Sequence, residues 1–167
     1  HRAAGYNNLA ISVGIHTGSL MLGVVGGTDR LDTTVISDTV NLASRIEHLT
    51  RDYDVSLLIT EDTFTQLPAS DPEFACIRRI DRVVPKGKSI AVNVYEVFTA
   101  DPEALRVSKL AGLSAFAAAC DAFHAGDAEA AHAQFEMLPT QHPDDTVIKH
   151  YVHRSAKQTA RVTLAGH

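Results

Sequence analysis

The sequence predicts an α+β sandwich followed by a separate helical segment, and two observations lead to this expectation. Up to about residue 100, short β-branched and apolar runs alternate with turns and short helical stretches, a mixture typical of α+β folds. Beyond residues 101–102 (Asp-Pro), alanine-rich helical periodicity replaces this pattern. We therefore expect a sandwich domain in residues 1–100 and a linker with a helical segment in residues 101–167.

Three strands are expected to begin the sandwich domain. Residues 9–16 form a β-branched run that predicts a buried strand. Residues 20–25 form a second run, closed by the glycine pair at 26–27, and residues 33–36 form a third. Because glycine enters tight turns at little steric cost, the second and third runs are expected to pair as a hairpin.

A helix should follow, with Ser37 or Asp38 as the N-cap that accepts a hydrogen bond from a free backbone amide. Its apolar positions recur at helical spacing: Val40, Leu42, Ala43, Ile46 and Leu49. Asn41 and Arg45 are four residues apart, so they should project from the same side of the helix, about one turn apart. On spacing alone, such a pair is more often part of a solvated surface than of a site.

The rest of the sandwich should contain one more strand, a short helix and a final antiparallel pair. Residues 55–60 form a strand-like run, and residues 61–67 form a short helical stretch. Residues 77–84 and 91–98 should pair around the turn P-K-G-K at 85–88.

The helical segment should begin at about Ser108 and contain three helices. Gly126 separates the first helix from a second in residues 128–138, and Pro143 separates that one from a third in residues 146–160. The pattern resembles one tetratricopeptide-type helical hairpin, although an alanine-rich tail without any repeat relation is also compatible with it. Because a single repeat cannot bury its own faces, the segment should pack on the sandwich domain or on further sequence.

Composition excludes several classes of protein. The net charge of −5 and the isoelectric point of about 6.0 argue against a general nucleic-acid binder, which would show a basic face. Cys76 and Cys120 are far apart and form no C-x-x-C motif, so neither a zinc site nor a disulfide framework is expected. No apolar run approaches the ~18 residues of a membrane span. A reducing, cytoplasmic location is therefore the expectation for this part of the protein.

One long string carries a family resemblance. Residues 33–47, T-T-V-I-S-D-T-V-N-L-A-S-R-I-E, resemble the signature of class III adenylate and guanylate cyclase catalytic domains. Residues 11–26 (I-S-V-G-I-H-T-G-S-L-M-L-G-V-V-G) are similar to the family's strand and hairpin, and residues 85–88 with the following V-N-V-Y-E-V to its closing hairpin. Together these segments cover roughly residues 7–99. The resemblance implies the C-terminal half of a sandwich with a ferredoxin-like core.

Roles for individual residues follow from the resemblance. Asn41 matches the family's ribose-orienting asparagine, and Arg45 matches the arginine that stabilises the pentavalent phosphorus during cyclisation. Lys86 matches a lysine that contacts the outer phosphates. Thr34 falls at the position that reads the purine, and the backbone carbonyl of Val35 would add a second acceptor. Because a threonine hydroxyl can either donate or accept, it specifies the base less sharply. The resemblance implies a mild preference for ATP over GTP.

The resemblance also implies an activity and an assembly. Members convert ATP to cyclic AMP and pyrophosphate as dimers, with two divalent metals, Mg²⁺ or Mn²⁺, in each site. A homodimer that binds ATP is therefore expected, with upstream sensor or membrane segments in the parent protein and a protein partner for the helical tail.

The family's two metal-binding aspartates lie in the N-terminal half of the domain, and Asp29, Asp32 and Asp38 do not match them. The chain alone is therefore expected to be inactive, and to aggregate or be only partly ordered, because sheet edges would be uncovered. A guanylate cyclase is one alternative, and it would differ from an adenylate cyclase only in base recognition. A catalytically silent dimerisation or scaffold module with a partner-binding tail is the alternative from a different class.

Overall fold

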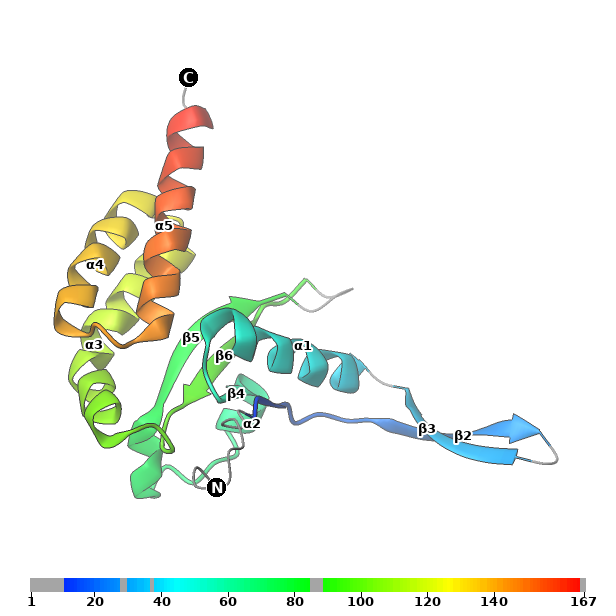
Figure 1. Cartoon of the computed structure of the whole chain (residues 1–167). Helices are drawn as coiled ribbons and strands as arrows, with labels where there is room; N and C mark the ends of the chain where they lie inside the picture. Colours follow the sequence, from blue (N-terminus) through cyan, green and yellow to red (C-terminus); the bar gives the residue numbers. More distant parts are fainter. Residues whose placement is uncertain (1–10, 28–29, 37, 85–88, 166–167) are drawn as a thin grey trace, which may run out of the picture.

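A four-stranded sheet forms the centre of the domain in the order β1-β4-β6-β5. The computed structural model describes residues 11–27, 30–36, 38–84 and 89–165, with 21–36 and 162–165 described by the backbone alone. The strands of the sheet are β1 (Val13–Ile15), β4 (Leu57–Thr60), β6 (Val92–Val97) and β5 (Ile77–Val83). The pair β1–β4 is parallel and the other two pairs are antiparallel. This mixed sheet with its helices confirms the α+β class (Figure 1).

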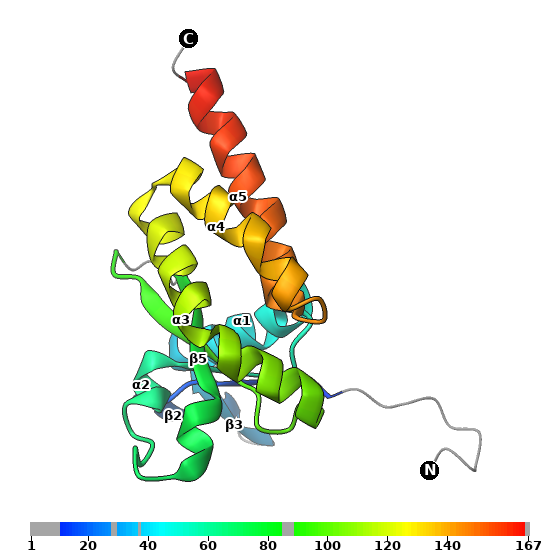
Figure 2. The same ribbon diagram turned by 90° about the vertical axis from the view of Figure 1, so that its left-hand side faces the viewer.

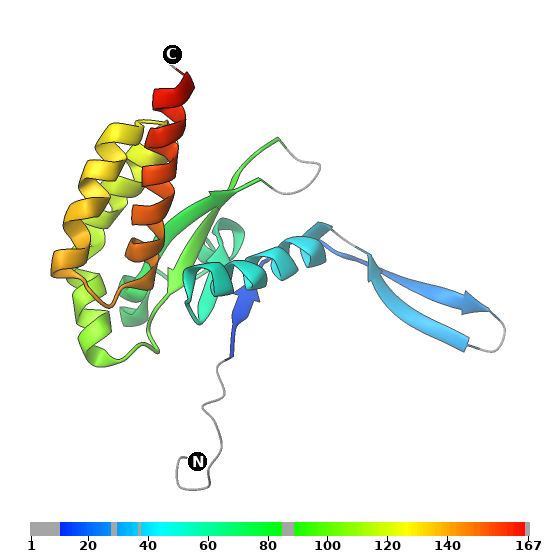
Figure 3. The same cartoon turned by 45° about the horizontal axis from the view of Figure 1, so that its top comes forward.

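The strands β2 (Met21–Gly27) and β3 (Arg30–Ile36) form a second, two-stranded sheet. They pair in antiparallel register from Met21 opposite Ile36 to Gly27 opposite Arg30. The expected hairpin is confirmed, but its first strand continues through both glycines instead of ending before them. The hairpin extends away from the body of the domain, as the views in Figures 1 and 3 both show.

The helix α1 (Asp38–Tyr53) packs against β1 and β4. Its buried face is formed by Leu42, Ile46, Thr50 and Tyr53. Val40, which was expected to lie in the apolar face, is exposed, because the buried face is centred on Leu42 and Ile46 one turn apart. Asp38 is already the first helical residue, and residue 37 lies outside the described residues, so the predicted cap stays a prediction.

The approach of β1 to α1 is very close at Gly14. A Cβ at this position would lie 2.3 Å from the backbone nitrogen of Glu47, well inside contact distance. A glycine therefore permits the strand to lie directly against the helix backbone. The strand itself is shorter than expected, because the described part of the predicted run is paired only from Val13 to Ile15.

The remaining elements of the sandwich agree with the sequence pattern, with one addition. The expected strand at 55–60, short helix and closing antiparallel pair correspond to β4, α2 (Glu61–Phe64), β5 and β6. An additional 3₁₀ helix, η2 (Pro72–Cys76), precedes β5, and its N-cap Asp71 accepts a hydrogen bond from the amide of Glu73. The turn predicted at 85–88 lies outside the described residues.

Three helices follow the sheet: α3 (Glu103–Ala125), α4 (Ala128–Gln141) and α5 (Thr146–Ala165). The break between α3 and α4 is at Gly126, whose φ of 85° is in the left-handed region that glycine adopts readily. Three predicted boundaries were wrong. Helix α5 continues to Ala165 instead of ending at residue 160. Helix α3 begins five residues before Ser108, and α4 continues through Pro139, because the amide of His142 still donates to the carbonyl of Leu138 and closes the last turn.

The helical segment packs on the sheet, as predicted for a segment that cannot bury its own apolar faces. Figure 2 shows α3, α4 and α5 stacked in front of the sheet, with α3 against β5. Side chains of both parts share one core, which includes Leu42 and Ile80 from the sandwich together with Phe116 and Tyr151 from the tail. A relation to tetratricopeptide repeats stays a prediction. Among the described residues, no helix is both long and apolar enough to cross a membrane.

Candidate functional site

Asn41 and Arg45 lie on the exposed side of α1, as the spacing predicted. Both side chains are exposed, while Leu42 and Ile46, each one position further along, are buried against the sheet. The amphipathic pattern of the helix therefore turns an amide and a guanidinium, one turn apart, toward the surface. Together they provide several N–H donors and one amide oxygen on one helix face, which suits phosphate oxygens and ribose hydroxyls.

Arg45 is tied to the end of strand β5. Its Nη1 donates a hydrogen bond of 2.6 Å to the backbone carbonyl of Val84, the residue directly after the strand. This contact uses one of the five N–H groups of a guanidinium and fixes the direction of the side chain. Lys86 follows Val84 by two residues but lies outside the described residues, so its predicted role is not tested.

Thr34 and Val35 lie near the end of β3, opposite Gly23 and Leu22 of β2. The strand ends at Ile36 and α1 begins at Asp38, so the chain leads directly from the predicted base-reading positions to the helix that carries Asn41. This part of the hairpin is described by its backbone alone. Whether these two residues face the same space as Asn41 and Arg45 therefore stays a prediction.

The described residues do not form a site for a divalent cation. No group of three or more His, Cys, Asp and Glu side chains comes together among them. Asn41 and Arg45 supply one amide and one guanidinium group, whereas Mg²⁺ and Mn²⁺ are usually held by several oxygen ligands that include carboxylates. The donor groups of Asn41 and Arg45 therefore do not by themselves fit a divalent cation.

A polar hollow lies beside the first turn of α1, and sequence reasoning did not single out its residues. His16 Nδ1 is 2.8 Å from Thr60 Oγ1, and Thr39 Oγ1 donates to the carbonyl of Ser19 over 2.7 Å. The hollow, about 300 Å³ in volume, is lined by His16, Thr17, Gly18, Ser19, Thr39, Leu42, Asp62 and Val92. The string I-H-T-G was the only sequence signal for it, and it was noted as part of the family resemblance alone.

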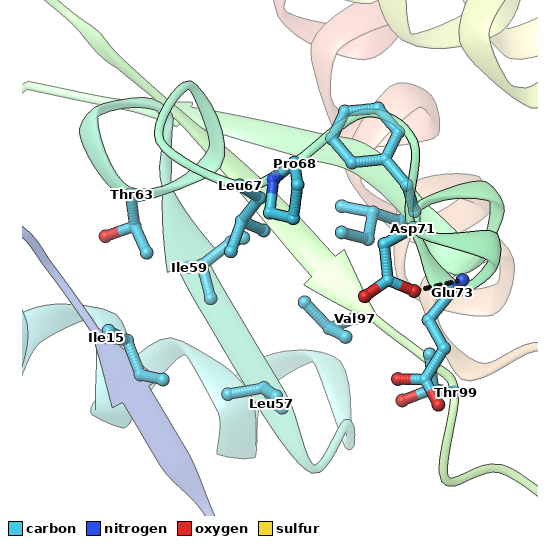
Figure 4. A pocket seen from close by; sticks show the side chains of 12 residues that line it. Ile15, Leu57, Ile59, Thr63, Leu67, Pro68, Asp71, Glu73, Val97 and Thr99 are labelled. Atoms are coloured by element: carbon cyan, nitrogen blue, oxygen red, sulfur yellow. Dashed lines mark hydrogen bonds between the residues drawn. The ribbon is translucent and has the colours of Figure 1, made fainter.

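A second, apolar groove of about 230 Å³ lies on the other face of the sheet. Figure 4 shows Leu57, Ile59 and Val97 pointing into it, with Leu67 and Pro68 along its rim. Strand side chains alternate between faces, so the groove is opposite the face on which Leu58 packs against the α1 core. It is therefore separated by the sheet from Asn41 and Arg45.

Three kinds of comparison relate the chain to known proteins. A family model described as "Adenylate and Guanylate cyclase catalytic domain" matches residues 1–98. "Adenylate cyclase, terminal-differentiation specific" of Dictyostelium discoideum is 36% identical over 159 residues, 95% of this chain and 7% of that protein. "Adenylate cyclase" of Anabaena cylindrica is 47% identical over 94 residues, 56% of this chain and 18% of that protein. "Adenylate cyclase 1" of Rhizobium meliloti is 36% identical over 96 residues, 58% of this chain and 14% of that protein.

Among solved structures, a bacterial light-regulated adenylyl cyclase matches 54% of this chain and 24% of that chain, at 26% identity and a TM-score of 0.43. The chain thus spans less than a fifth of the length of the curated relatives it matches. The similarity to the Dictyostelium protein differs from the other two in its extent, since at 95% coverage it continues into the helical tail.

Proposed function

We propose that this chain, which belongs to the adenylate and guanylate cyclase catalytic domain family, supplies the nucleotide-recognising half of an adenylate cyclase. The observation that carries the proposal is the exposed pair Asn41 and Arg45, which lies on the helix that bears the family's signature string. The curated relatives are named adenylate cyclases, and this favours ATP over GTP as the substrate.

The proposed reaction places Arg45 at the phosphorus. The 3′ oxygen of ATP forms a bond with the α-phosphorus, the bond from that phosphorus to the bridging oxygen breaks, and pyrophosphate leaves. The proton of the 3′ hydroxyl passes to a base outside the described residues. Negative charge grows on the phosphoryl oxygens in this step, and a guanidinium held in place by Val84 stabilises it without having to reorganise.

Asn41 and the predicted nucleotide contacts would orient the substrate. An amide one turn before Arg45 can donate to and accept from the ribose, which sets the 3′ oxygen in line with the α-phosphorus. We assign base reading to Thr34 and the carbonyl of Val35, and contact with the outer phosphates to Lys86. Positioning of this kind contributes to the rate because the reacting atoms then meet without further loss of freedom.

A second catalytic half would complete the site. Members of this family typically dimerise, bind ATP and generally use Mg²⁺ or Mn²⁺. The carboxylates for the metal would come from outside the described residues, and bound metal would neutralise the triphosphate. We propose a homodimer in which Asn41 and Arg45 of one protomer face the metal-binding part of its partner. Their exposure supports such an arrangement.

The full-length gene product, incubated with ATP or GTP and Mn²⁺, tests the proposal. We expect cyclic AMP to form faster than cyclic GMP, and Arg45→Ala to lower the rate by ~100-fold or more, the typical effect of losing one transition-state donor. Arg45→Lys should not restore it, because an ammonium cannot provide the bidentate geometry. Arg51→Ala, an exposed arginine on the same helix, is the matched control and should keep full activity.

Two outcomes would contradict the proposal. A folded wild-type protein that forms no cyclic nucleotide from either ATP or GTP would favour the scaffold alternative. Activity that survives in Arg45→Ala would remove this residue from the site. Separately, Thr34→Asp should change the ratio of cyclic AMP to cyclic GMP, and an unchanged ratio would place base recognition elsewhere.

A further inference from the structure

The helix that carries Arg45 is cross-linked to strand β5 at two points. At the first, Arg45 donates to the carbonyl of Val84, just after the strand. At the second, the hydroxyl of Tyr53, the last residue of α1, donates to Oδ2 of Asp81 over 2.7 Å. The second link is fully buried, since Tyr53 is 1% and Asp81 5% exposed.

The two links are spaced alike along both elements. From Arg45 to Tyr53 the helix advances by about 12 Å, at 1.5 Å for each of eight residues. From Asp81 to Val84 the strand advances by about 10 Å, at 3.3 Å for each of three residues. The two links therefore join stretches of similar length on the two elements, so a displacement at the Tyr53 end would be carried along the helix to Arg45.

The helical tail holds the buried link from the other side. Arg154 of α5 donates through Nη1 to the hydroxyl of Tyr53 and, over 3.3 Å, to Oδ2 of Asp81. Tyr151, also on α5, donates to the carbonyl of Ile80 over 2.5 Å. Burial and the nearby Asp81 carboxylate raise the pKa of the Tyr53 phenol, so this hydroxyl remains a donor at any working pH.

The tail also contacts the chain directly after α1. Thr146, the first residue of α5, donates to the carbonyl of Asp54 over 3.1 Å. The guanidinium of Arg154 lies 5.0 Å from the ring centres of both Phe123 and Tyr151. These cation–π contacts help to hold the guanidinium in this position. The C-terminal end of α1 is therefore fixed by the tail, whereas the end near Asn41 is exposed.

We propose that Tyr53, Asp81 and Arg154 are positioning residues through which the helical tail sets the placement of Arg45 in the cyclase site. The inference rests on the proposed function, because it assigns the tail a part in the same reaction. It is supported by the similarity to the Dictyostelium relative, which continues into the tail. A tail that served only to bury apolar surface would not need a buried polar link to the catalytic helix.

Two substitutions in the full-length gene product test this role. Arg154→Gln removes the charge and one link while keeping a long polar side chain, and Tyr53→Phe removes only the hydroxyl. Since a misplacement of about 1 Å in a site can cost up to 10²-fold, we expect kcat to fall about 5- to 20-fold with KM for ATP changed less than about 2-fold. Lys157→Gln, an exposed cation on the same helix, is the matched control and should match wild type.

The decisive readout is coupling to Arg45. If Arg154 acts through Arg45, then Arg154→Gln should lower the rate by less than about 2-fold in an Arg45→Ala background, because there is no guanidinium left to place. Equal fold-losses in both backgrounds would overturn the proposal and leave Arg154 as a purely structural residue. An increase in KM with kcat unchanged would also overturn it.

Hydrogen exchange separates this proposal from the proposed function. If the wild-type protein is silent with ATP and GTP, the proposed function fails, and the link is then judged by amide exchange in α1. Faster exchange at residues 41–45 in Tyr53→Phe and Arg154→Gln, but not in Lys157→Gln, would support transmission along the helix. Unchanged exchange in all three would overturn it, whatever the activity.

Discussion

The two sides of the domain differ in how deeply their polar and charged side chains are buried. On the side of Asn41 and Arg45, the candidate residues are exposed, and β1 forms an edge of the sheet with Val13 and Ile15 each about 40% exposed. On the side of the helical tail, each charged side chain that is buried has a hydrogen-bonding partner: Arg78, Asp81, Glu96, Lys109 and Asp145. The first arrangement is compatible with the proposed pairing with a second catalytic half, and the second is an interface within the chain.

The tail interface is built around Arg78 of β5. Its Nε donates to Glu96 over 2.7 Å, and its two Nη atoms donate to the two oxygens of Asp145 over 2.6 and 2.9 Å. Lys109 of α3 pairs with Glu96 and with Asp101. Asp145 also accepts hydrogen bonds from the amides of residues 147 and 148. It therefore caps the N-terminus of α5 while it pairs with Arg78 of the sheet. Hydrogen bonding and the charge of Arg78 lower the pKa of Asp145 against the opposing effect of burial.

The comparison teaches that the stability of this chain should be more sensitive to substitution of the buried charges than of the exposed polar residues. Buried ion pairs contribute little net stability, but removing one partner is costly because the other charge stays buried and unpaired. Exposed polar residues cost almost nothing to replace. Substitutions at the tail interface should therefore affect unfolding, whereas those at Asn41 and Arg45 should affect activity alone.

The largest expected effect is at Arg78. Replacing it in Arg78→Met leaves Glu96 and Asp145 buried without this partner, which should lower the free energy of unfolding by about 3–5 kcal/mol. The midpoint of thermal unfolding should then fall by roughly 10 °C. Arg82→Met, at an exposed position of the same strand, is the control. Equal unfolding midpoints for the two variants would show that burial of the charge does not decide the loss of stability.

A smaller loss of stability is expected at Gly14, on the side of the candidate site. Its Cβ in Gly14→Ala would meet the backbone of residues 46 and 47, which cannot move without separating β1 from α1. Overpacking of this kind costs about 1–3 kcal/mol, measurable by urea unfolding. Gly18→Ala is the matched control, because its nearest atoms are side-chain atoms of His16 and Thr39 at 3.0 Å or more. A Gly14→Ala variant as stable as Gly18→Ala would contradict the close packing.

Lowering the pH from 7.5 to 5.5 should lower the free energy of unfolding by less than Gly14→Ala does. Burial lowers the pKa of His124 and of His150, so both take up protons less readily in the folded than in the unfolded protein. Stability is then complete above the ordinary histidine pKa of about 6.5 and is lost as the pH falls below it. Asp145 acts in the same direction only below its ordinary pKa near 3.8.

Thermal unfolding of wild type and of His124→Gln/His150→Gln across this pH range measures the effect. The double variant should lose most of the dependence between pH 7.5 and 5.5. If both proteins show the same dependence, other groups govern it. His48→Gln is the control, since this exposed histidine has its ring nitrogen near Ser44 and Glu47 on the same helix.

The smallest effect is expected for the surface pair of Arg51 and Glu47 on α1. Their side chains are 64% and 28% exposed, and such pairs contribute ~1 kcal/mol or less. Arg51→Ala should therefore shift the urea midpoint only slightly. A loss as large as that of Arg78→Met would show that exposure does not separate the two classes of charge.

Sequence patterns predicted the helices and strands better than the side-chain contacts between them. Periodicity located α1, the closing strand pair and the breaks at Gly126 and Pro143, because these signals are local. The pairing of Arg78 with Asp145 spans 67 residues, and a charged residue in a strand looks the same in sequence whether it is buried or exposed. Val40 was misplaced for a related reason, since the face of α1 that is buried depends on where the sheet lies.

The candidate site was predicted to a similar degree. Asn41 and Arg45 were found because a helix fixes the relation of residues four apart, and the family string identified them. The hydrogen bond from Arg45 to Val84 joins segments 39 residues apart and was not predictable from either one. The link from Tyr53 to Arg154 was likewise not anticipated, because its residues are separated by 101 positions.

The rate of cyclic AMP formation per folded molecule in Arg45→Ala, measured with the unfolding midpoint of the same sample, tests the central claim most directly. The account predicts a rate at least ~100-fold below wild type and an unfolding midpoint within about 2 °C of it. An unchanged rate, or a lost rate accompanied by an equally lost fold, would contradict the assignment of the chemistry to this exposed side of α1.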